Sequence, residues 1–160
     1  MVSTLKKFLE SQQIRFQVLA TTGIAARIAG GMTIHSFFGL TTRLHLKMDR
    51  MSLQADVIKN LQVLIIDEVS MLDLRLFLKI DAIMRSYQTH EKRMNLSFGG
   101  RNIILIADPA QLLVVKGESI FSHPLFEKFK VFNLKEIVRQ KDMEFDSYLN
   151  EIRKEKFQTW

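Results

Sequence analysis

The chain has 160 residues, 47% of them hydrophobic and 25% charged, which fits a single globular domain with a core of its own. It has no cysteine, which excludes disulfides and thiolate metal sites, and its four histidines are too scattered for a zinc site. No apolar run approaches the roughly 18 residues that cross a bilayer, and the first residues do not have the pattern of a secretory signal. We therefore expect an intracellular protein without a membrane partner. The net charge of +6 is compatible with a polyanionic partner.

Apolar residues at helical and strand spacing predict that helices and strands alternate along the chain. The first helix is indicated by Leu5, Phe8 and Leu9, with Ser3 as a possible cap. The elements expected after it, in chain order, are a strand at 15–20, short helices within 21–31 and 33–40, a helix at 51–60, a strand at 63–67, a helix at 76–87, a polar and basic loop at 88–100, strands at 102–108 and 130–134, and a final helix marked by Phe145, Tyr148, Leu149 and Ile152.

Two of the expected strands are continuous apolar runs, VLII at 63–66 and IILIA at 103–107. Strands covered on both faces have this pattern, and they belong to parallel sheets of the α/β class. Open parallel sheets bind ligands at the carboxyl ends of their strands. The acidic residues Asp67, Glu68 and Asp108 follow these two runs, so we expect them at that edge of the sheet.

The pair Asp67–Glu68 at the end of an apolar strand has the form of a Walker B element. In such an element the aspartate holds Mg²⁺, a hard cation that prefers oxygen ligands. The glutamate polarises the water that attacks the γ-phosphate. An alternative is that the two acids only begin the next loop and cap the helix that starts at Leu74.

Four segments in register give the pair a wider setting: TTGIAARIAGGMTIHSFFGL, LIIDEVSML, SFGGRNIILIADPAQL and FNLKEIVRQKDMEFDSYLNEIR. Together they resemble motifs Ia, II, III and IV of the Pif-type (petite integration frequency) DNA helicases of superfamily one B and their RecD-like and Helitron relatives. The resemblance covers nearly the whole chain and implies that residues 1–160 form one partial RecA-like P-loop NTPase domain. It also implies ATP and Mg²⁺ as cofactors, single-stranded and duplex DNA as partners, and 5′-to-3′ unwinding in DNA repair, recombination and telomere maintenance, in the nucleus or mitochondrion of a eukaryote.

The same resemblance implies roles for individual residues. Asp67 would coordinate Mg²⁺, Glu68 would be the catalytic base, Gln111 would sense the γ-phosphate and Arg139 would place its guanidinium on it. The residues implied to contact single-stranded DNA are Thr22, Gly23, His35, Ser36 and Phe37. Other roles stay open, because Phe37 and Phe38 could belong to the core, His35 could bond within a turn and Arg139 could lie on the surface.

One motif that an ATP-driven helicase needs is absent from the sequence. No glycine precedes Lys-Ser or Lys-Thr, so there is no GxxxxGK[ST] loop to hold the β- and γ-phosphates. The chain opens Met1-Val2-Ser3-Thr4-Leu5 where the family has Gly-Lys-Ser-Thr-Leu. We therefore expect that the chain begins where the phosphate loop was cut, with Ser3 as the Mg²⁺-binding hydroxyl and Thr4 beside it in the nucleotide site.

This absence has structural consequences under the same resemblance. The phosphate-loop strand would lie between the motif III and motif IV strands, so we expect either that residues 130–134 pair with the strand at 102–108 or that a gap persists, with low stability in both cases. Motif III also departs from the family pattern, because Ala107 replaces a glycine and Leu113-Val114 replace two prolines, which affects the placement of Gln111. The second RecA-like domain is absent as well, so we expect little activity from these 160 residues alone.

Two further interpretations remain. The chain could be a non-catalytic module that grips nucleic acid through motif Ia and a set of basic residues, or a decayed remnant of a mobile element. The basic residues are Arg27, Arg43, Lys47, Arg50 and those of the loop 90–101. A nucleotide kinase fits badly, because motif Ia and the FGG motif have no role in one.

Overall fold

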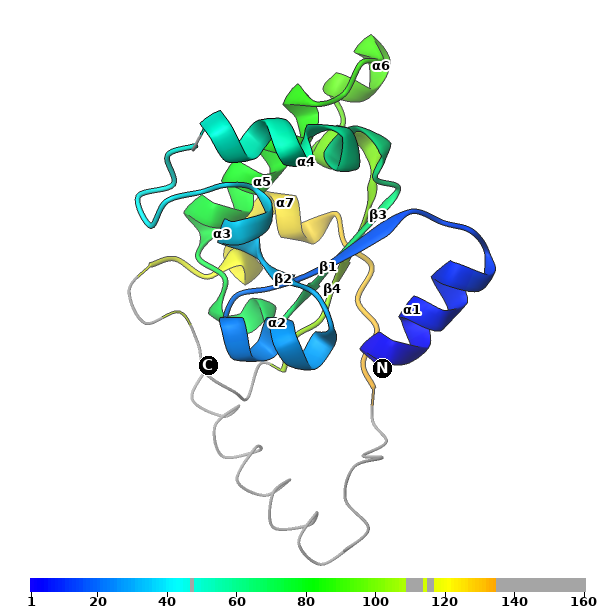
Figure 1. Cartoon of the computed structure of the whole chain (residues 1–160). Coiled ribbons are helices and arrows are strands. Elements are labelled where there is room, and N and C mark those ends of the chain that lie inside the picture. Colours follow the sequence, from blue (N-terminus) through cyan, green and yellow to red (C-terminus); the bar gives the residue numbers. More distant parts are fainter. Residues whose placement is uncertain (47, 109–113, 115–116, 135–160) are drawn as a thin grey trace, which may run out of the picture.

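Four parallel strands form one sheet at the centre of the molecule (Figure 1). The structure is a computed structural model and describes residues 1–46, 48–108, 114 and 117–134. The strands are β1 (Phe16–Ala20), β2 (Met32–Thr33), β3 (Val63–Asp67) and β4 (Asn102–Leu105), in the order β2-β1-β3-β4. Every neighbouring pair is parallel, which confirms the α/β class expected from the continuous apolar runs.

Successive residues of β3 point to opposite faces of the sheet and supply two cores. Val63 and Ile65 pack with α1 (Val2–Ser11), whereas Leu64 and Ile66 pack with α5 (Leu74–Ser86). Figure 1 shows these two helices on opposite sides of the sheet. The other helical segments are α2 (Gly23–Ala29), α3 (Ile34–Phe37), α4 (Met48–Asn60), α6 (Glu91–Met94), α7 (Pro124–Glu127) and the 3₁₀ turns η1 (Val69–Met71), η2 (Ser97–Gly100) and η3 (Ile120–Ser122).

Several element boundaries differ from the sequence-based expectation. Helix α1 has Met1 at its N-cap, so Ser3 lies inside the first turn and does not cap it. Strand β4 ends at Leu105, although the Ile106 N–H still donates to the Ile66 carbonyl at 2.9 Å. The loop expected at 88–100 contains the two short helical segments α6 and η2.

The strand expected at 130–134 is not formed. Val131, Phe132 and Leu134 are largely exposed, and the segment joins no ladder of the sheet. Within the described residues β4 pairs with β3 alone, so the first expectation, pairing of residues 130–134 with this strand, is wrong. The prediction failed because a residue pattern indicates only that a segment is suited to form a strand. It does not indicate whether a neighbouring strand is available for pairing. The final helix expected around 145–152 lies outside the described residues.

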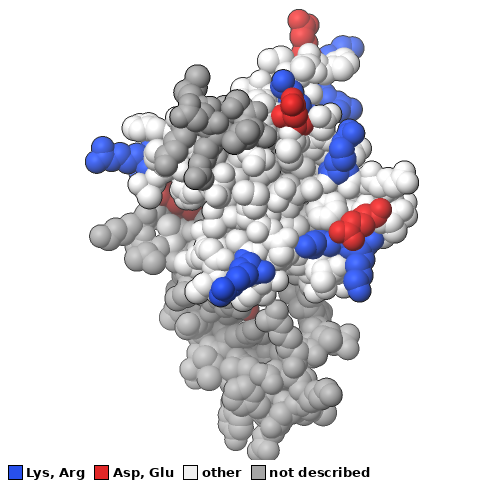
Figure 2. Space-filling view, viewed as in Figure 1, with Lys and Arg blue, Asp and Glu red and all other residues white. Residues whose placement is uncertain are grey.

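Charged side chains are spread over the surface. Figure 2 shows Lys and Arg at several separate places on the viewed face, with Asp and Glu among them. The positive net charge therefore forms no single track on this face that would indicate a nucleic-acid path by itself. None of the helices that the structure describes has both the length and the apolar character needed to span a bilayer.

Candidate functional site

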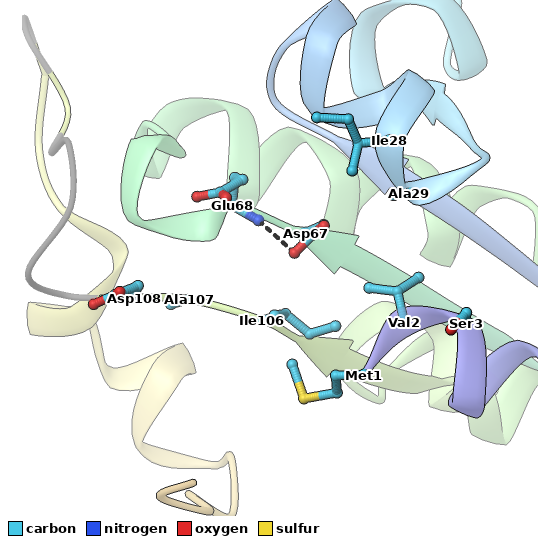
Figure 3. Close-up of a pocket in the computed structure, with 10 residues that line it drawn as sticks. All are labelled: Met1, Val2, Ser3, Ile28, Ala29, Asp67, Glu68, Ile106, Ala107 and Asp108. Atoms are coloured by element: carbon cyan, nitrogen blue, oxygen red, sulfur yellow. Dashed lines mark hydrogen bonds between the residues drawn. The ribbon is translucent and has the colours of Figure 1, made fainter. Parts of the chain in front are cut away.

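A cavity of about 370 Å³ opens at the carboxyl edge of the sheet. The parallel register brings strand ends together there, because Ala20 pairs with Asp67 and Ile66 with Leu105. Figure 3 shows the cavity between the start of α1, the end of β3 and the segment after β4. Residues of these three parts that line it are Met1, Val2, Ser3, Asp67, Glu68, Ile106, Ala107 and Asp108. The acidic residues therefore lie at the edge where the sequence placed them, and Ser3 lies there with them.

Asp67 and Glu68 are adjacent in sequence but held differently. Asp67 ends the strand, and its Oδ1 accepts the Glu68 N–H at 3.1 Å. Glu68 lies in the left-handed region at φ 57° and ψ 44°, a conformation that a residue with a Cβ adopts only when its surroundings impose it. Both side chains are half-buried at the cavity. The position of this strained residue at a cavity is typical of a functional site.

The alternative role of the pair as a helix cap is not observed. The N-cap of α5 is Asp73, whose Oδ1 accepts the Arg75 N–H at 2.8 Å. Arg75 also donates from its guanidinium to the same carboxylate at 2.7 Å. This contact holds the pKa of Asp73 below its ordinary value of 3.8. Asp67 and Glu68 line the cavity instead, with η1 between them and the start of α5.

The start of α1 contributes the wall opposite the acidic pair. The Met1 carbonyl accepts the N–H groups of Thr4 and Leu5, both at 3.1 Å, and the first turn has no acidic residue. Its unpaired N–H groups and the positive end of the helix dipole suit an anion such as phosphate. Thr4 is exposed and does not line the cavity, so of the two residues expected in the nucleotide site only Ser3 lines the same cavity as Asp67.

The residues expected to contact DNA follow the two neighbouring strands β1 and β2. Thr22 caps α2, its Oγ1 accepting the Ala25 N–H at 3.2 Å, and Gly23 is exposed at the first position of that helix. His35 and Ser36 are half-buried in α3, which starts after the residue paired with Ala20. These four residues therefore lie along the carboxyl edge, on the β1–β2 side of the cavity.

Phe37 is the exception among the expected DNA contacts. Its side chain has no exposed surface and meets the Phe38 ring edge-on, with ring centroids 4.9 Å apart. A ring buried to this degree cannot stack on a base, so the prediction is corrected in favour of the core alternative. Its burial anchors α3 and thereby positions His35 and Ser36.

The sequence-based prediction missed some residues of the site, and it named two residues that lie outside the part of the chain that the structure describes. It did not single out Thr21, whose hydroxyl lies 3.4 Å from the Glu68 carbonyl oxygen, or Ile28 and Ala29, which line the cavity. The signal for Thr21 was its place one residue past the end of a strand neighbouring β3. Gln111 and Arg139 lie outside the described residues, so their convergence on the cavity stays a prediction.

The complete chain, residues 1–160, matches the family model described as PIF1-like helicase. The chain belongs to this family. Among curated relatives, the PIF1-like chain is 31% identical over 170 residues to the ATP-dependent DNA helicase Pif1 of Psychrobacter sp. (strain PRwf-1), an alignment covering 92% of this chain and 25% of the relative. It is 34% identical over 161 residues to protein 030L of Invertebrate iridescent virus 6, covering 87% and 30% respectively. The PIF1-like chain thus spans between a quarter and a third of the length of these relatives.

A solved structure gives the same assignment. The crystal structure of Pif1 helicase from Bacteroides in complex with ADP-AlF3 and single-stranded DNA superposes with a TM-score of 0.80 at 30% identity. The match covers 96% of this PIF1-like chain and 39% of the Bacteroides chain. It confirms the RecA-like α/β domain that the motifs implied.

Proposed function

We propose that this PIF1-like chain is the nucleotide- and DNA-binding part of an ATP-dependent DNA helicase that unwinds DNA in the 5′-to-3′ direction. One observation carries the proposal: the acidic pair Asp67–Glu68 and the start of α1 face the same cavity at the carboxyl edge of a parallel sheet. Relatives named ATP-dependent DNA helicase and a solved relative in complex with ADP-AlF3 and single-stranded DNA support it.

The residues at the cavity fit ATP with Mg²⁺. Within the described part of the chain no cluster of three or more His, Cys, Asp or Glu residues could hold a metal, so an all-protein cage is not available there. Mg²⁺ does not need one, because it keeps several waters and binds through one or two protein oxygens plus phosphates. Asp67 and Ser3 would supply those oxygens, and the ion would neutralise charge on the phosphates.

The chain's own groups then have separate tasks. The first-turn N–H groups of α1 bind phosphate oxygens. The Glu68 carboxylate orients a water and accepts its proton as that water attacks the γ-phosphate. We assign contacts with the γ-phosphate to Gln111 and Arg139. Because the sequence has no GxxxxGK[ST] loop, whose lysine and amides supply much of the electrostatic stabilisation, we expect weak ATP binding and very slow hydrolysis by these residues alone.

The DNA path in this proposal runs along the other half of the same edge. Thr22, Gly23, His35 and Ser36 offer hydroxyls, a close backbone approach and an imidazole to a single strand. Duplex DNA is the substrate of the complete helicase. Repair, recombination and telomere maintenance are the processes we propose for it, with an intracellular location, the nucleus or mitochondrion in a eukaryote.

The proposal is tested by titrating a fluorescent ATP analogue in Mg²⁺ into three proteins: the chain, Asp67→Asn and Asp56→Asn. Asp56 is an exposed residue of α4 whose only described ion pair is a 3.9 Å contact with Lys59, so its variant is the matched control. We expect Mg²⁺-dependent binding that Asp67→Asn weakens at least tenfold and Asp56→Asn leaves unchanged. A second preparation, extended through a restored phosphate loop, should bind more tightly. Equal affinity of all three proteins, or no binding even after extension, would contradict the proposal.

A non-catalytic nucleic-acid-binding module is the second candidate, favoured by the net charge of +6. It predicts oligonucleotide binding that weakens steeply with salt, because counterions are released, and that does not respond to ATP. Binding of this kind, with no nucleotide binding in the extended preparation, would replace the helicase proposal.

A further inference from the structure

One peptide group beside the cavity is held from both neighbouring strands. Its carbonyl is that of Glu68, which accepts a hydrogen bond from the Thr21 hydroxyl at 3.4 Å. Its N–H is that of Val69, which donates to the Ile106 carbonyl at 3.0 Å. Thr21 follows β1, and Ile106 follows β4, the two strands that flank β3. The Glu68–Val69 peptide is therefore fixed across three strands of the sheet.

This fixation bears on where the Glu68 carboxylate lies. A residue with a Cβ leaves the left-handed region when nothing holds it there, and Glu68 has a φ of 57°. A change of φ or ψ at Glu68 rotates its side chain relative to the cavity that it now lines. The bonds that hold the following peptide thus help to keep the carboxylate facing the cavity.

Thr21 also adjoins the segment expected to contact DNA. The next two residues are Thr22, the cap of α2, and Gly23, the first residue of that helix. The Thr21–Glu68 distance of 3.4 Å is long for a hydroxyl donor, for which about 2.8 Å is usual. The bond consequently has room to shorten when the backbone of this segment shifts.

We propose that Thr21 is a positioning residue that acts through Glu68. Its hydroxyl keeps the Glu68–Val69 peptide in place, and contact of a single strand with Thr22 and Gly23 shortens this bond and so reaches the carboxylate at the cavity. The inference rests on the proposed function for its DNA and its hydrolysis, but the positioning itself is a property of the chain alone.

The positioning is tested by NMR on the 160-residue chain. The readouts are the carbonyl ¹³C shift of Glu68, which reports hydrogen bonding, and its H^N–Hα coupling, which reports φ. Thr21→Val removes the donor at nearly constant shape, Thr21→Ser keeps it, and Thr42→Val changes an exposed threonine away from the cavity. We expect both readouts to change in Thr21→Val and to match the wild type in the other two variants. Unchanged readouts in Thr21→Val, or equal changes in Thr21→Ser, would overturn the positioning role.

The link to DNA is tested by adding a thymidine oligonucleotide. It is added first to the wild-type chain, so that this part of the test does not depend on the folding of any variant. We expect a downfield shift of the Glu68 carbonyl in the wild type and in Thr21→Ser, and none in Thr21→Val, with affinities for the oligonucleotide within twofold of one another. Binding that leaves the wild-type carbonyl unmoved, or that moves it equally in Thr21→Val, overturns the link. If the wild type binds no oligonucleotide, the proposed DNA role fails together with the link, whereas the comparison of variants without DNA still decides the positioning.

Discussion

At the scale of single residues, the carboxylates of Asp67 and Glu68 are held in different ways because the backbone changes conformation between them. Asp67 is still in the ladder, paired with Ala20, and its side chain is turned back to the next N–H. Glu68 has already left the strand in a left-handed turn. In the proposed function Asp67 is the metal ligand, for which a rigid strand end is an advantage. Glu68 is the proposed base, and its side chain leaves the backbone in a different direction from that of Asp67 because the turn comes between them.

A pH prediction belongs to Asp73, whose pKa is lowered chiefly by the hydrogen bond from the Arg75 side chain. A carboxyl whose pKa is lower in the folded state than in the unfolded state stabilises the protein at pH values above the ordinary carboxyl pKa of 3.8. This stabilisation is lost as the pH falls through the folded-state pKa. The ion pair is near the surface, so we expect less than about 1 kcal/mol.

Asp73→Asn keeps a side chain that can cap α5 and removes the charge. Urea unfolding of both proteins across a pH series should show a constant stability difference near neutral pH, which begins to shrink below the ordinary carboxyl pKa and is gone below the lowered folded-state pKa. Asp56→Asn is the control and should show a smaller difference. A gap between Asp73→Asn and the wild type that widens on acidification would contradict this assignment.

At the scale of elements, one arginine joins the ends of two helices. The Arg101 guanidinium donates to the carbonyls of Lys59 and Leu61 at the end of α4, at 3.4 and 3.2 Å, and to Met84 in the last turn of α5 at 2.7 Å. Partial burial, and secondarily the charge of Arg93, lowers the pKa of Arg101. The arginine remains charged, because its ordinary pKa is far above neutral pH.

Arg101→Lys tests this double cap. A lysine has no planar fork and leaves at least one carbonyl without its donor, so we expect a loss of about 1–2 kcal/mol in the free energy of unfolding. Arg15→Lys is the matched control, since Arg15 is exposed and its side chain makes one bond to the end of α4, to the Asn60 carbonyl at 2.7 Å. We expect the control to change stability by less than about 0.5 kcal/mol. Equal effects in the two variants would show that the second helix end is not held by Arg101.

Two glycines of motif Ia have different reasons to be small. A Cβ at Gly31 would overlap the Val18 carbonyl group, whereas a Cβ at Gly23 would meet nothing within 4 Å. Gly31 therefore serves the packing of the segment before β2 against β1. Gly23 has no packing reason in the described residues, and the proposed function assigns it close approach of a DNA strand.

Gly31→Ala should accordingly destabilise the chain by about 2 kcal/mol or more, through a displaced backbone. Gly23→Ala should leave stability within about 1 kcal/mol of the wild type, or raise it slightly, because alanine favours helices. The same Gly23→Ala variant should weaken oligonucleotide binding. Thermal melts and oligonucleotide titrations of both variants check this pair, and a Gly23→Ala variant that unfolds easily but binds DNA normally would reverse the assignment.

At the scale of the whole molecule, the sequence predicted what long apolar runs determine and missed what depends on neighbours. The run VLIID became β3 with the expected limits because both faces of a central strand must be apolar. The two-residue β2 has no pattern of its own and exists through pairing with Leu19 and Ala20. The left-handed Glu68 could not be predicted either, since nothing in DEVS indicates a positive φ and the hydrogen bonds to the next peptide come from Thr21 and Ile106, which are distant in sequence.

The site was predicted in part for the same reason. Asp67, Glu68 and Ser3 line one cavity because β3 ends at the carboxyl edge of the sheet and α1, which precedes β1, starts at that edge. Phe37 failed as a DNA contact because an aromatic residue in a short helix serves the core equally well, and composition cannot separate the two. Within the described residues β4 pairs with β3 alone and not with residues 130–134, and both the expected gap and the low stability of the chain stay predictions.

The central claim is that the acidic pair after Ile66 forms the metal-binding corner of a nucleotide site. Paramagnetic Mn²⁺, added with ADP in place of Mg²⁺, broadens the NMR signals of amides near it. The account predicts selective broadening of Ser3, Glu68 and Asp108, no broadening at Asp56 or Glu91, and loss of the effect in Asp67→Asn. Broadening centred on another acidic surface, or unchanged in Asp67→Asn, would contradict it.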